Sequence, residues 1–205
     1  MALLPATLEY NALYPEAVLK LLEQLTRSEA IDAEQAQHMR SAAYQQHLRQ
    51  HPKTATELKE WFRRLPESDK HHAQLTRIVA TSFNEQNEPL LARDVLEQTL
   101  AVEWDSDLAE CYGEVVLSGD ALTAQLQQAE TWLKQHPHDH RLLLTLGRLC
   151  RQRELWGKAQ TYFEASIAIH PTAIAHAELA RLLDTLEREE ESNHHYRASL
   201  ALALH

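Results

Sequence analysis

A spacing of 33 to 34 residues recurs along the chain and constrains its fold more than any other feature of the sequence. Pro137 and Pro171 lie 34 residues apart, as do Gly113 and Gly147. Small and large apolar residues around Gly147 fall at the spacing of a tetratricopeptide repeat, which is a helix hairpin of about 34 residues. This set comprises Leu143, Leu146, Gly147, Cys150, Ala159, Phe163, Ser166 and Pro171. The spacing therefore predicts helices that pack in antiparallel pairs.

The same pattern occurs in two further places. Downstream it falls on Leu179, Ala180, Leu183, Ser192, Tyr196 and Ser199, and upstream on Val79, Ala80, Phe83, Ala92, Leu96 and Thr99. The unit that begins near Ser106 fits less well, because Gln125 stands where a small residue is usual. A lone hairpin cannot bury its apolar face, so such units stack. We therefore expect an all-α fold, a right-handed tetratricopeptide-repeat superhelix, with an irregular helical bundle as the alternative.

Turn signals divide the chain into segments whose apolar residues recur with the helical period of 3.6. Thr54 followed by Glu57 is a capping-box pattern that marks a helix start. The predicted helices span residues 15–28, 32–50, 54–65, 69–86, 88–102, 105–118, 121–136, 139–153, 155–169, 172–187 and 189–204. No segment has the composition of a flexible linker. We therefore expect a single domain over residues 1–205, with clear repeats over 73–205 and more divergent helix pairs over 15–66.

Composition argues against several classes of function. Only 4 glycines occur in 205 residues, and they form no glycine-rich phosphate-binding turn of a dinucleotide-binding or P-loop enzyme. The net charge of −10 disfavours a nucleic-acid partner. The two cysteines, Cys111 and Cys150, lie in apolar segments and are expected to be buried thiols in a reducing compartment. Because no signal peptide and no run of about 18 apolar residues occurs, we expect a soluble chain.

The stretch from Thr56 to Leu202 resembles the C-terminal half of the HemY-type protohaem IX biogenesis proteins. Four segments carry the resemblance, and the last, Leu-Trp-Gly-Lys-Ala at the start of a second helix, is the most specific of them. The segments are 58–66 (LKEWFRRLP), 129–133 (AETWL), 142–149 (LLLTLGRL) and 155–159 (LWGKA). The resemblance covers about three quarters of the chain.

The resemblance implies a role and a location. Members of this family are tetratricopeptide-repeat proteins of the bacterial inner membrane, with two N-terminal spanning helices that we do not find in this chain. It implies a scaffold that holds enzymes of late haem synthesis together at the cytoplasmic face of that membrane. It does not imply that the chain itself makes haem. An unrelated flavin-dependent protoporphyrinogen oxidase shares the name, but the dinucleotide-binding fingerprint of such an enzyme is missing here.

Polar residues on the first helix of each predicted pair are the candidate partner-binding residues, because repeat arrays bind peptides along the surface that these helices form. They are Arg77, Asn84, Glu110, Glu114, Arg141, Arg148, Arg151 and Arg181. The stripe formed by Arg141, Arg148 and Arg151 is unusual in an acidic protein. It is either an anchor for an acidic peptide or a porphyrin propionate, or it is neutralised by Glu110 and Glu114 of the adjacent repeat.

The 13 histidines are the one unusual feature of the composition. His136, His138 and His140 alternate in a turn and could hold Zn²⁺, Ni²⁺ or Cu²⁺. However, His170 occupies the equivalent turn one repeat later, which favours a turn preference over a ligand set. We therefore predict no metal and no cofactor. No motif of a nucleophile with its base is present, so we expect no enzymatic activity.

The sequence thus favours a protein–protein interaction scaffold, with haem-synthesis enzymes as possible partners through the family resemblance. The alternative is a carrier of haem, porphyrin or a metal, with the arginine stripe and a histidine as ligands. Leu200, Leu202 and Leu204 leave the last predicted helix apolar where a terminal helix is normally polar, which predicts a possible homodimer contact there.

Overall fold

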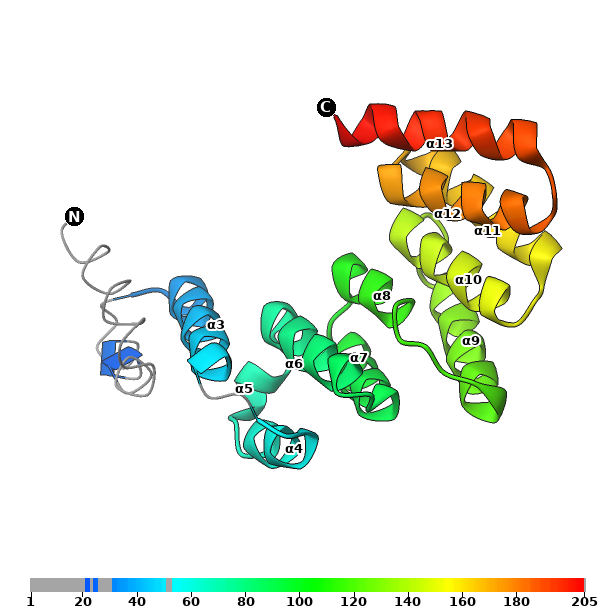
Figure 1. Ribbon diagram of the computed structural model, residues 1–205. Coiled ribbons are helices and arrows are strands. Elements are labelled where there is room, and N and C mark those ends of the chain that lie inside the picture. Colours follow the sequence, from blue (N-terminus) through cyan, green and yellow to red (C-terminus); the bar gives the residue numbers. More distant parts are fainter. Residues whose placement is uncertain (1–20, 23, 26–30, 51–52, 205) are drawn as a thin grey trace. The chain divides into compact units, whose positions relative to one another are not determined.

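The computed structural model describes residues 21–22, 24–25, 31–50 and 53–204, and the regular secondary structure of these residues is α-helical (Figure 1). The predicted helix over 15–28 lies outside the described residues, apart from four of its positions. The chain divides into two compact units, Met1–Trp104 and Asp105–His205. The single repeat array predicted over residues 1–205 stays a prediction.

The first unit ends in one helix hairpin with three helices packed against it. Its helices are α3 (Ala33–Gln50), α4 (Ala55–Arg63), α5 (Glu67–Lys70), α6 (Ala73–Glu85) and α7 (Pro89–Val102). The hairpin consists of α6 and α7, and α3, α4 and α5 all contact α6. The predicted capping box at the start of α4 is confirmed: the backbone N–H of Glu57 donates to Thr54, and the Glu57 carboxylate accepts from the Thr54 backbone.

The predicted helix over 69–86 is wrong in its first part, because the chain forms two helices there with a break at His71 and His72. Polar contacts to α3 hold the chain on both sides of the break. Buried Asp69 accepts a hydrogen bond from the Tyr44 hydroxyl at 2.7 Å, and the His72 ring is 2.7 Å from the Ser41 hydroxyl. At the end of α5 the Lys70 carbonyl accepts a hydrogen bond from the Thr76 hydroxyl at 3.2 Å, so a side chain supplies a donor where the helix stops.

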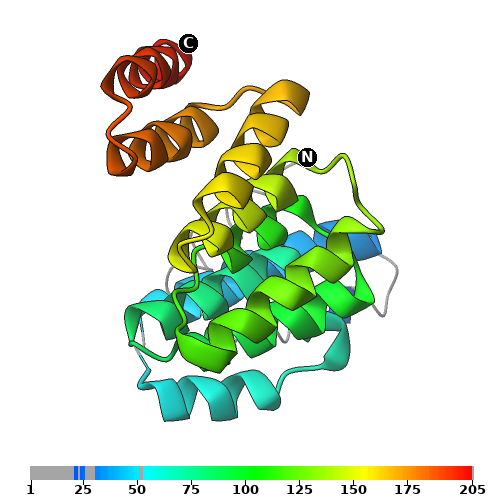
Figure 2. The ribbon, with the colours of Figure 1, turned by 90° about the vertical axis from the view of Figure 1, so that its right-hand side faces the viewer.

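The second unit contains two helix hairpins preceded by a less regular pair. Its helices are α8 (Ser106–Tyr112), α9 (Gly119–Leu133), α10 (His140–Gln152), α11 (Trp156–Ile169), α12 (Ala173–Thr185) and α13 (Glu189–Ala203). The hairpins are α10–α11 and α12–α13, and the second is visible as adjacent orange and red helices in Figure 2. Helix α10 is central, because α8, α9, α11 and α12 all contact it. Every residue of α10 from Leu142 to Cys150 is buried.

Small residues allow the close helix contact that the repeat pattern predicts. A Cβ atom added to Gly147 on α10 would lie 2.3 Å from the ring of Phe163 on α11. Ala159, the small residue predicted on α11, is fully buried. The ring of Phe163 therefore fills the space that a side chain at position 147 would need, and this contact fixes the α10–α11 hairpin.

All three hairpins turn in the same way. Asn87, Glu154 and Glu187 each have a positive φ, of 60°, 57° and 58° respectively. In each turn the next backbone N–H donates to a carbonyl five residues earlier, which is the hydrogen bond of a Schellman motif. The pairs are Glu88 to Phe83 at 2.9 Å, Leu155 to Cys150 at 2.9 Å and Arg188 to Leu183 at 3.0 Å. The three predicted hairpins therefore share one turn geometry as well as one spacing.

The predicted helix over 105–118 is too long. Helix α8 ends at Tyr112, and residues 115–118 are not helical. Fully buried Gln125 on α9 explains this departure, because its amide nitrogen donates to the carbonyls of Tyr112 at 2.8 Å and Val115 at 3.1 Å. The Tyr112 carbonyl otherwise accepts only a long turn hydrogen bond, from the Val115 backbone N–H at 3.4 Å, and the Gln125 side chain adds a donor to both carbonyls.

Candidate functional site: a charged surface on the first helices

Helices α8, α10 and α12 lie in sequence order across the second unit, with α10 in contact with both of the others. Four arginines and four carboxylates on these helices form ion pairs with one another, and we call this set the arginine–carboxylate surface. Its members are Asp107, Glu110, Glu114, Arg141, Arg148, Arg151, Glu178 and Arg181. Six of the eight predicted site residues are therefore brought together. The other two, Arg77 and Asn84, are exposed on α6 of the first unit.

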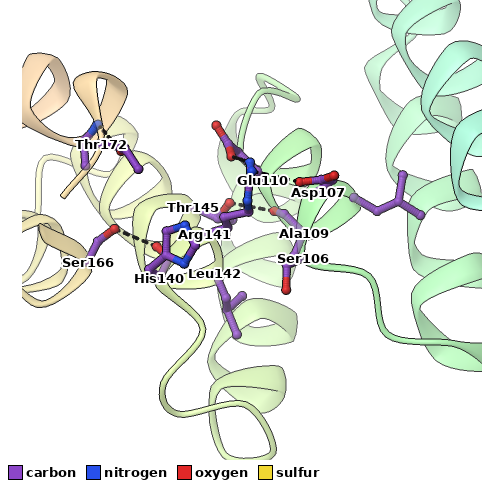
Figure 3. A network of polar contacts seen from close by, with 12 residues as sticks. Ser106, Asp107, Ala109, Glu110, His140, Arg141, Leu142, Thr145, Ser166 and Thr172 are labelled. Carbon is purple, nitrogen blue, oxygen red and sulfur yellow. Dashed lines mark hydrogen bonds and ion pairs between the residues drawn. The ribbon is translucent and has the colours of Figure 1, made fainter. Parts of the chain in front are cut away.

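Arg141 forms one end of the surface (Figure 3). Its guanidinium donates to the Glu110 carboxylate and pairs with Asp107 at 3.1 Å. Burial acts to lower the pKa of Arg141, but the hydrogen bond and charge of Glu110 outweigh it, so the pKa is raised. Behind this pair, the Thr145 hydroxyl donates to the Ala109 carbonyl at 2.6 Å. The Arg141 side chain is therefore held by α8, and α8 by α10.

The centre of the surface is a buried ion pair between α10 and α12. The Arg148 and Glu178 side chains are only 9% and 8% exposed, and Nε of Arg148 donates to Oε1 of Glu178 at 3.0 Å. The other oxygen of Glu178 is 2.7 Å from Arg151 and 3.6 Å from Arg181. One carboxylate therefore pairs with three arginines, and its pairing with Arg148 is what makes the burial of that arginine tolerable.

Arg148 keeps one donor that is not used. Its Nη1 atom is buried without a hydrogen-bond partner, and the carboxylate nearest to it in the ion-pair network is that of Glu114 at 3.8 Å. Glu114 is exposed at the end of α8, where the helix has stopped. An exposed side chain at this distance is easily displaced by another carboxylate.

The sequence left two interpretations of the arginine stripe open, and the structure bears on both. All three arginines are paired with carboxylates, as the second interpretation supposed. The strongest partner, however, is Glu178 of the following helix, which the sequence analysis did not single out. A signal for Glu178 exists, because it lies one helical turn before Arg181 and 30 residues after Arg148.

Histidines beside the surface form pairs. The rings of His140 and His170 are 4.8 Å apart, and the Nδ1 atoms of His176 and His195 are 2.9 Å apart. Burial lowers the pKa of His140, His176 and His195, and the neighbouring histidine lowers it further in each case. Within the described residues, no group of three or more histidine, cysteine or acidic side chains is arranged to hold a metal ion.

Cys111 is only partly buried, so the expectation of two buried thiols is confirmed for Cys150 alone. Cys150 lies in the core of α10, and burial raises the pKa of its thiol to about 11. It is therefore protonated at neutral pH and acts as a small apolar side chain there. Along the part of the chain that the structure describes, no helix has the length and apolar character needed to cross a bilayer.

No protein-family model matches the chain, and neither does any curated protein. Solved structures of similar fold do exist. MamA residues 41 to the end, from Desulfovibrio magneticus RS-1, superpose with a TM-score of 0.51 at 16% identity, over 80% of this chain and 93% of that one. A double mutant, MamA RS-1 ArsTM, gives 0.51 at 15% identity, over 80% and 92% of the two chains. PilF of Pseudomonas aeruginosa gives 0.48 at 18% identity, over 91% and 75%.

The likeness to MamA shows the fold alone, since the identities are low. MamA is a tetratricopeptide-repeat protein, and the chain shares its all-helical repeat architecture. The fold class predicted from the 33- to 34-residue spacing is therefore confirmed. The HemY-type resemblance stays a prediction.

Proposed function

We propose that the chain is a non-enzymatic interaction scaffold that binds an acidic segment of a partner protein through the arginine–carboxylate surface. The observation that carries this proposal is that four arginines lie on α10 and α12, the first helices of two consecutive hairpins. They are Arg141, Arg148, Arg151 and Arg181. In repeat arrays these helices form the surface that receives extended peptides. Arginine is suited to this task because its planar guanidinium can grip a carboxylate through two parallel hydrogen bonds.

Binding at this surface exchanges one carboxylate for another. Exposed ion pairs contribute only about 0.2 to 1 kcal/mol, so the pairs made by Asp107 and Glu114 are readily replaced. The buried pair of Arg148 with Glu178 is different, because separating it leaves a charge without compensation inside the protein. A partner therefore engages Arg141, Arg151 and the unused donor of Arg148 while the central pair stays intact.

The test uses the full chain as bait in a lysate of the organism that carries its gene, with bound proteins identified by mass spectrometry. The informative variant is Arg141→Gln with Arg151→Gln, which removes two positive charges and keeps polar side chains that can donate hydrogen bonds. The matched control is Lys134→Gln with Lys158→Gln, which removes two cations from elsewhere in the same unit. We expect the wild type and the control to retain the same proteins, and the arginine variant to lose them.

Salt gives a second measurement on the same material. Because the contacts are ionic and partly exposed, retention should fall as ionic strength rises from about 0.05 M to 0.5 M. Retention of the same proteins by the arginine variant, with the same salt dependence as the wild type, would overturn the proposed binding surface.

The haem-related part of the proposal rests on the resemblance to HemY-type proteins, as does the inner-membrane location. If it is correct, enzymes of late haem synthesis are among the proteins that the wild type retains and the arginine variant loses. The same preparation tests the alternative of a haem carrier, for which titration with haem would give a saturable Soret shift. We favour the scaffold because the arginines lie along the first helices of two consecutive hairpins, which is the surface by which repeat arrays receive extended peptides.

A further inference from the structure

The outer face of α13 differs from the equivalent face of the preceding second helix, α11. The two helices are related by the 33-residue spacing, so Phe163 and Ile167 on α11 correspond to Tyr196 and Leu200 on α13. Phe163 is completely buried, whereas Tyr196 is 39% exposed and Leu200 is 62% exposed. Leu204, one turn further along α13, is also exposed. Ile167 is partly buried, so the two equivalent positions are more covered on α11 than on α13.

The element that covers α11 is the first helix of the next hairpin. Helix α12 packs against both α11 and α10. The other helix of this hairpin, α13, is the last helix in the part of the chain that the structure describes (Figure 2). Its apolar stripe, formed by Tyr196, Leu200 and Leu204, is exposed. The packing of α12 on the α10–α11 hairpin therefore indicates what fits the stripe on α13, namely an amphipathic helix of the same kind as α12.

Charge gives a second and independent indication. Arg148 on α10 corresponds to Arg181 on α12 at the same 33-residue spacing. Arg148 pairs with Glu178, a carboxylate that α12 supplies when it packs on the α10–α11 hairpin. Arg181 is 59% exposed, and its ion pair is the long one of 3.6 Å to Glu178 on its own helix. The helix that covers α13 would therefore meet Arg181 where α12 meets Arg148.

We propose that the stripe Tyr196–Leu200–Leu204 of α13, together with Arg181, is a docking site for an acidic amphipathic helix of a partner protein. The helix places apolar side chains on the stripe and one carboxylate on Arg181. This site goes beyond the proposed function, because it is an end surface that receives a helix, whereas the arginine–carboxylate surface receives an extended acidic segment.

The position of Tyr196 is already fixed for this contact. Its hydroxyl donates to Asp184 on α12 at 2.7 Å, and the Ser192 hydroxyl donates to the other oxygen of the same carboxylate. The Tyr196 ring therefore needs little reordering when a helix packs on it, which reduces the entropic cost of binding.

A second copy of the chain fits the stripe less well. The nine residues from Tyr196 to Leu204 are about 12 Å long as a helix, and a stable dimer needs about 800 Å² of buried surface on each partner. The acidic residues of α13 itself, Glu189, Glu190 and Glu191, lie at its opposite end. A paired α13 would thus offer no carboxylate to Arg181. The dimer expected from the sequence is therefore kept as an outcome of the test.

The probe is a fluorescein-labelled peptide of residues 172–188 of this chain, which contains the apolar face of α12 and Glu178. Its binding to the full chain is followed by fluorescence anisotropy. We expect saturable binding, weakened at least tenfold by Leu200→Asp and at least tenfold by Arg181→Glu. Leu90→Asp is the control, because Leu90 is an exposed leucine in the first unit, and this variant should bind the peptide as the wild type does.

A charge swap separates a specific contact from damage to the fold. The Arg181→Glu chain should bind a peptide that carries Glu178→Arg more tightly than it binds the original peptide. The same altered peptide should not restore binding to the Leu200→Asp chain. Equal affinity of the wild type and Leu200→Asp for the original peptide would overturn the proposal. Self-association of the wild type in sedimentation, lost in Leu200→Asp and accompanied by no peptide binding, would also overturn it in favour of a dimer. Leu200→Asp changes no residue of the arginine–carboxylate surface, so this variant separates the helix-docking site from the site proposed for extended segments, whereas Arg181 belongs to both.

Discussion

The α8–α9 pair and the α10–α11 hairpin occupy consecutive repeats of 34 residues, yet only α10 and α11 form a regular hairpin. Both first helices carry a glycine at the same position, Gly147 and Gly113. The second helices differ, because α11 has Ala159 where α9 has Gln125. Ala159 lets α10 and α11 pack side by side, whereas the Gln125 amide takes the carbonyls at the end of a shortened α8. The residue at this position therefore allows two helices to pack closely in one unit and supplies hydrogen bonds at the end of the first helix in the other.

The glycine that the two units share has a different neighbour in each. A Cβ at Gly147 would meet the ring of Phe163 on the other helix of its own hairpin. A Cβ at Gly113 would instead lie 2.9 Å from the Cα of Thr145 on α10, the first helix of the next unit. The same small residue therefore closes a hairpin in one unit and joins two units in the other.

The largest expected loss of stability distinguishes the contact of α10 with α12 from its contact with α8. Glu178→Ala removes the carboxylate that compensates buried Arg148 between α10 and α12, and should lower the free energy of unfolding by about 3 to 5 kcal/mol. Glu110→Ala at the junction with α8 leaves Arg141, which is partly exposed and also paired with Asp107, and should cost about 1 kcal/mol or less. Urea unfolding followed by circular dichroism measures both variants, and equal losses would contradict this ranking.

The next effect tests the account of the α8–α9 pair directly. Gln125→Ala creates the small residue that the repeat pattern expects, but it leaves the carbonyls of Tyr112 and Val115 without their donor. We expect a loss of about 1 to 3 kcal/mol in unfolding free energy and no gain of helix. Circular dichroism at 222 nm and urea unfolding measure the two quantities. An increase in helix content with unchanged stability would show that Gln125 is what prevents a regular hairpin.

The fold could be predicted where packing between neighbouring helices depends on residue size. Gly147, Ala159 and Phe163 stand at fixed separations because each one touches another, so their spacing is visible in the sequence. The end of α8 could not be placed in this way. Val115, Val116 and Leu117 continue an apolar run, and the hydrogen bonds that favour the end of the helix come from Gln125, on the next helix.

The candidate site could be predicted in part for a similar reason. The register places Arg141, Arg148 and Arg151 on one face of a single helix, so their proximity follows from helical periodicity. Which carboxylate each arginine meets depends on how far the neighbouring helices are offset along their axes. Sequence separation does not reveal that offset, so the sequence predicts Glu110 as a partner of the arginines but does not predict Glu178.

A smaller effect separates the two regular hairpins. His176 and His195 stand on α12 and α13 where α10 and α11 have Leu143 and Tyr162. Burial first, and the neighbouring histidine second, lower the pKa of His176. His194 lowers the pKa of His195, while Glu164 and Glu191 oppose the shift. The folded state therefore favours the neutral rings, and only one proton can occupy the hydrogen bond between the two Nδ1 atoms.

Because the folded pKa values are below the unfolded value of about 6.5, the stabilisation by this pair is present above pH 6.5. It is lost as the pH falls from there through the folded pKa values. The urea midpoint should therefore decrease between pH 7.5 and pH 5, and less so in a His176→Leu, His195→Tyr variant that copies the other hairpin. His138→Gln, which alters an exposed turn histidine, serves as the control. A double variant with the full pH dependence of the wild type would exclude this pair as the cause.

The smallest effect compares the turns of the three hairpins. Glu154 and Glu187 have φ values of 57° and 58°, in a region that side chains with a Cβ occupy at a cost of about 1 kcal/mol. Asn87 has the same conformation in the α6–α7 turn, but asparagine tolerates it better. Glu154→Gly should therefore stabilise the protein by about 0.5 to 1 kcal/mol, and Asn87→Gly by less. Urea unfolding of the two variants at neutral pH provides the comparison. A gain at Asn87 that equals the gain at Glu154 would show that asparagine has no advantage over glutamate in this turn conformation.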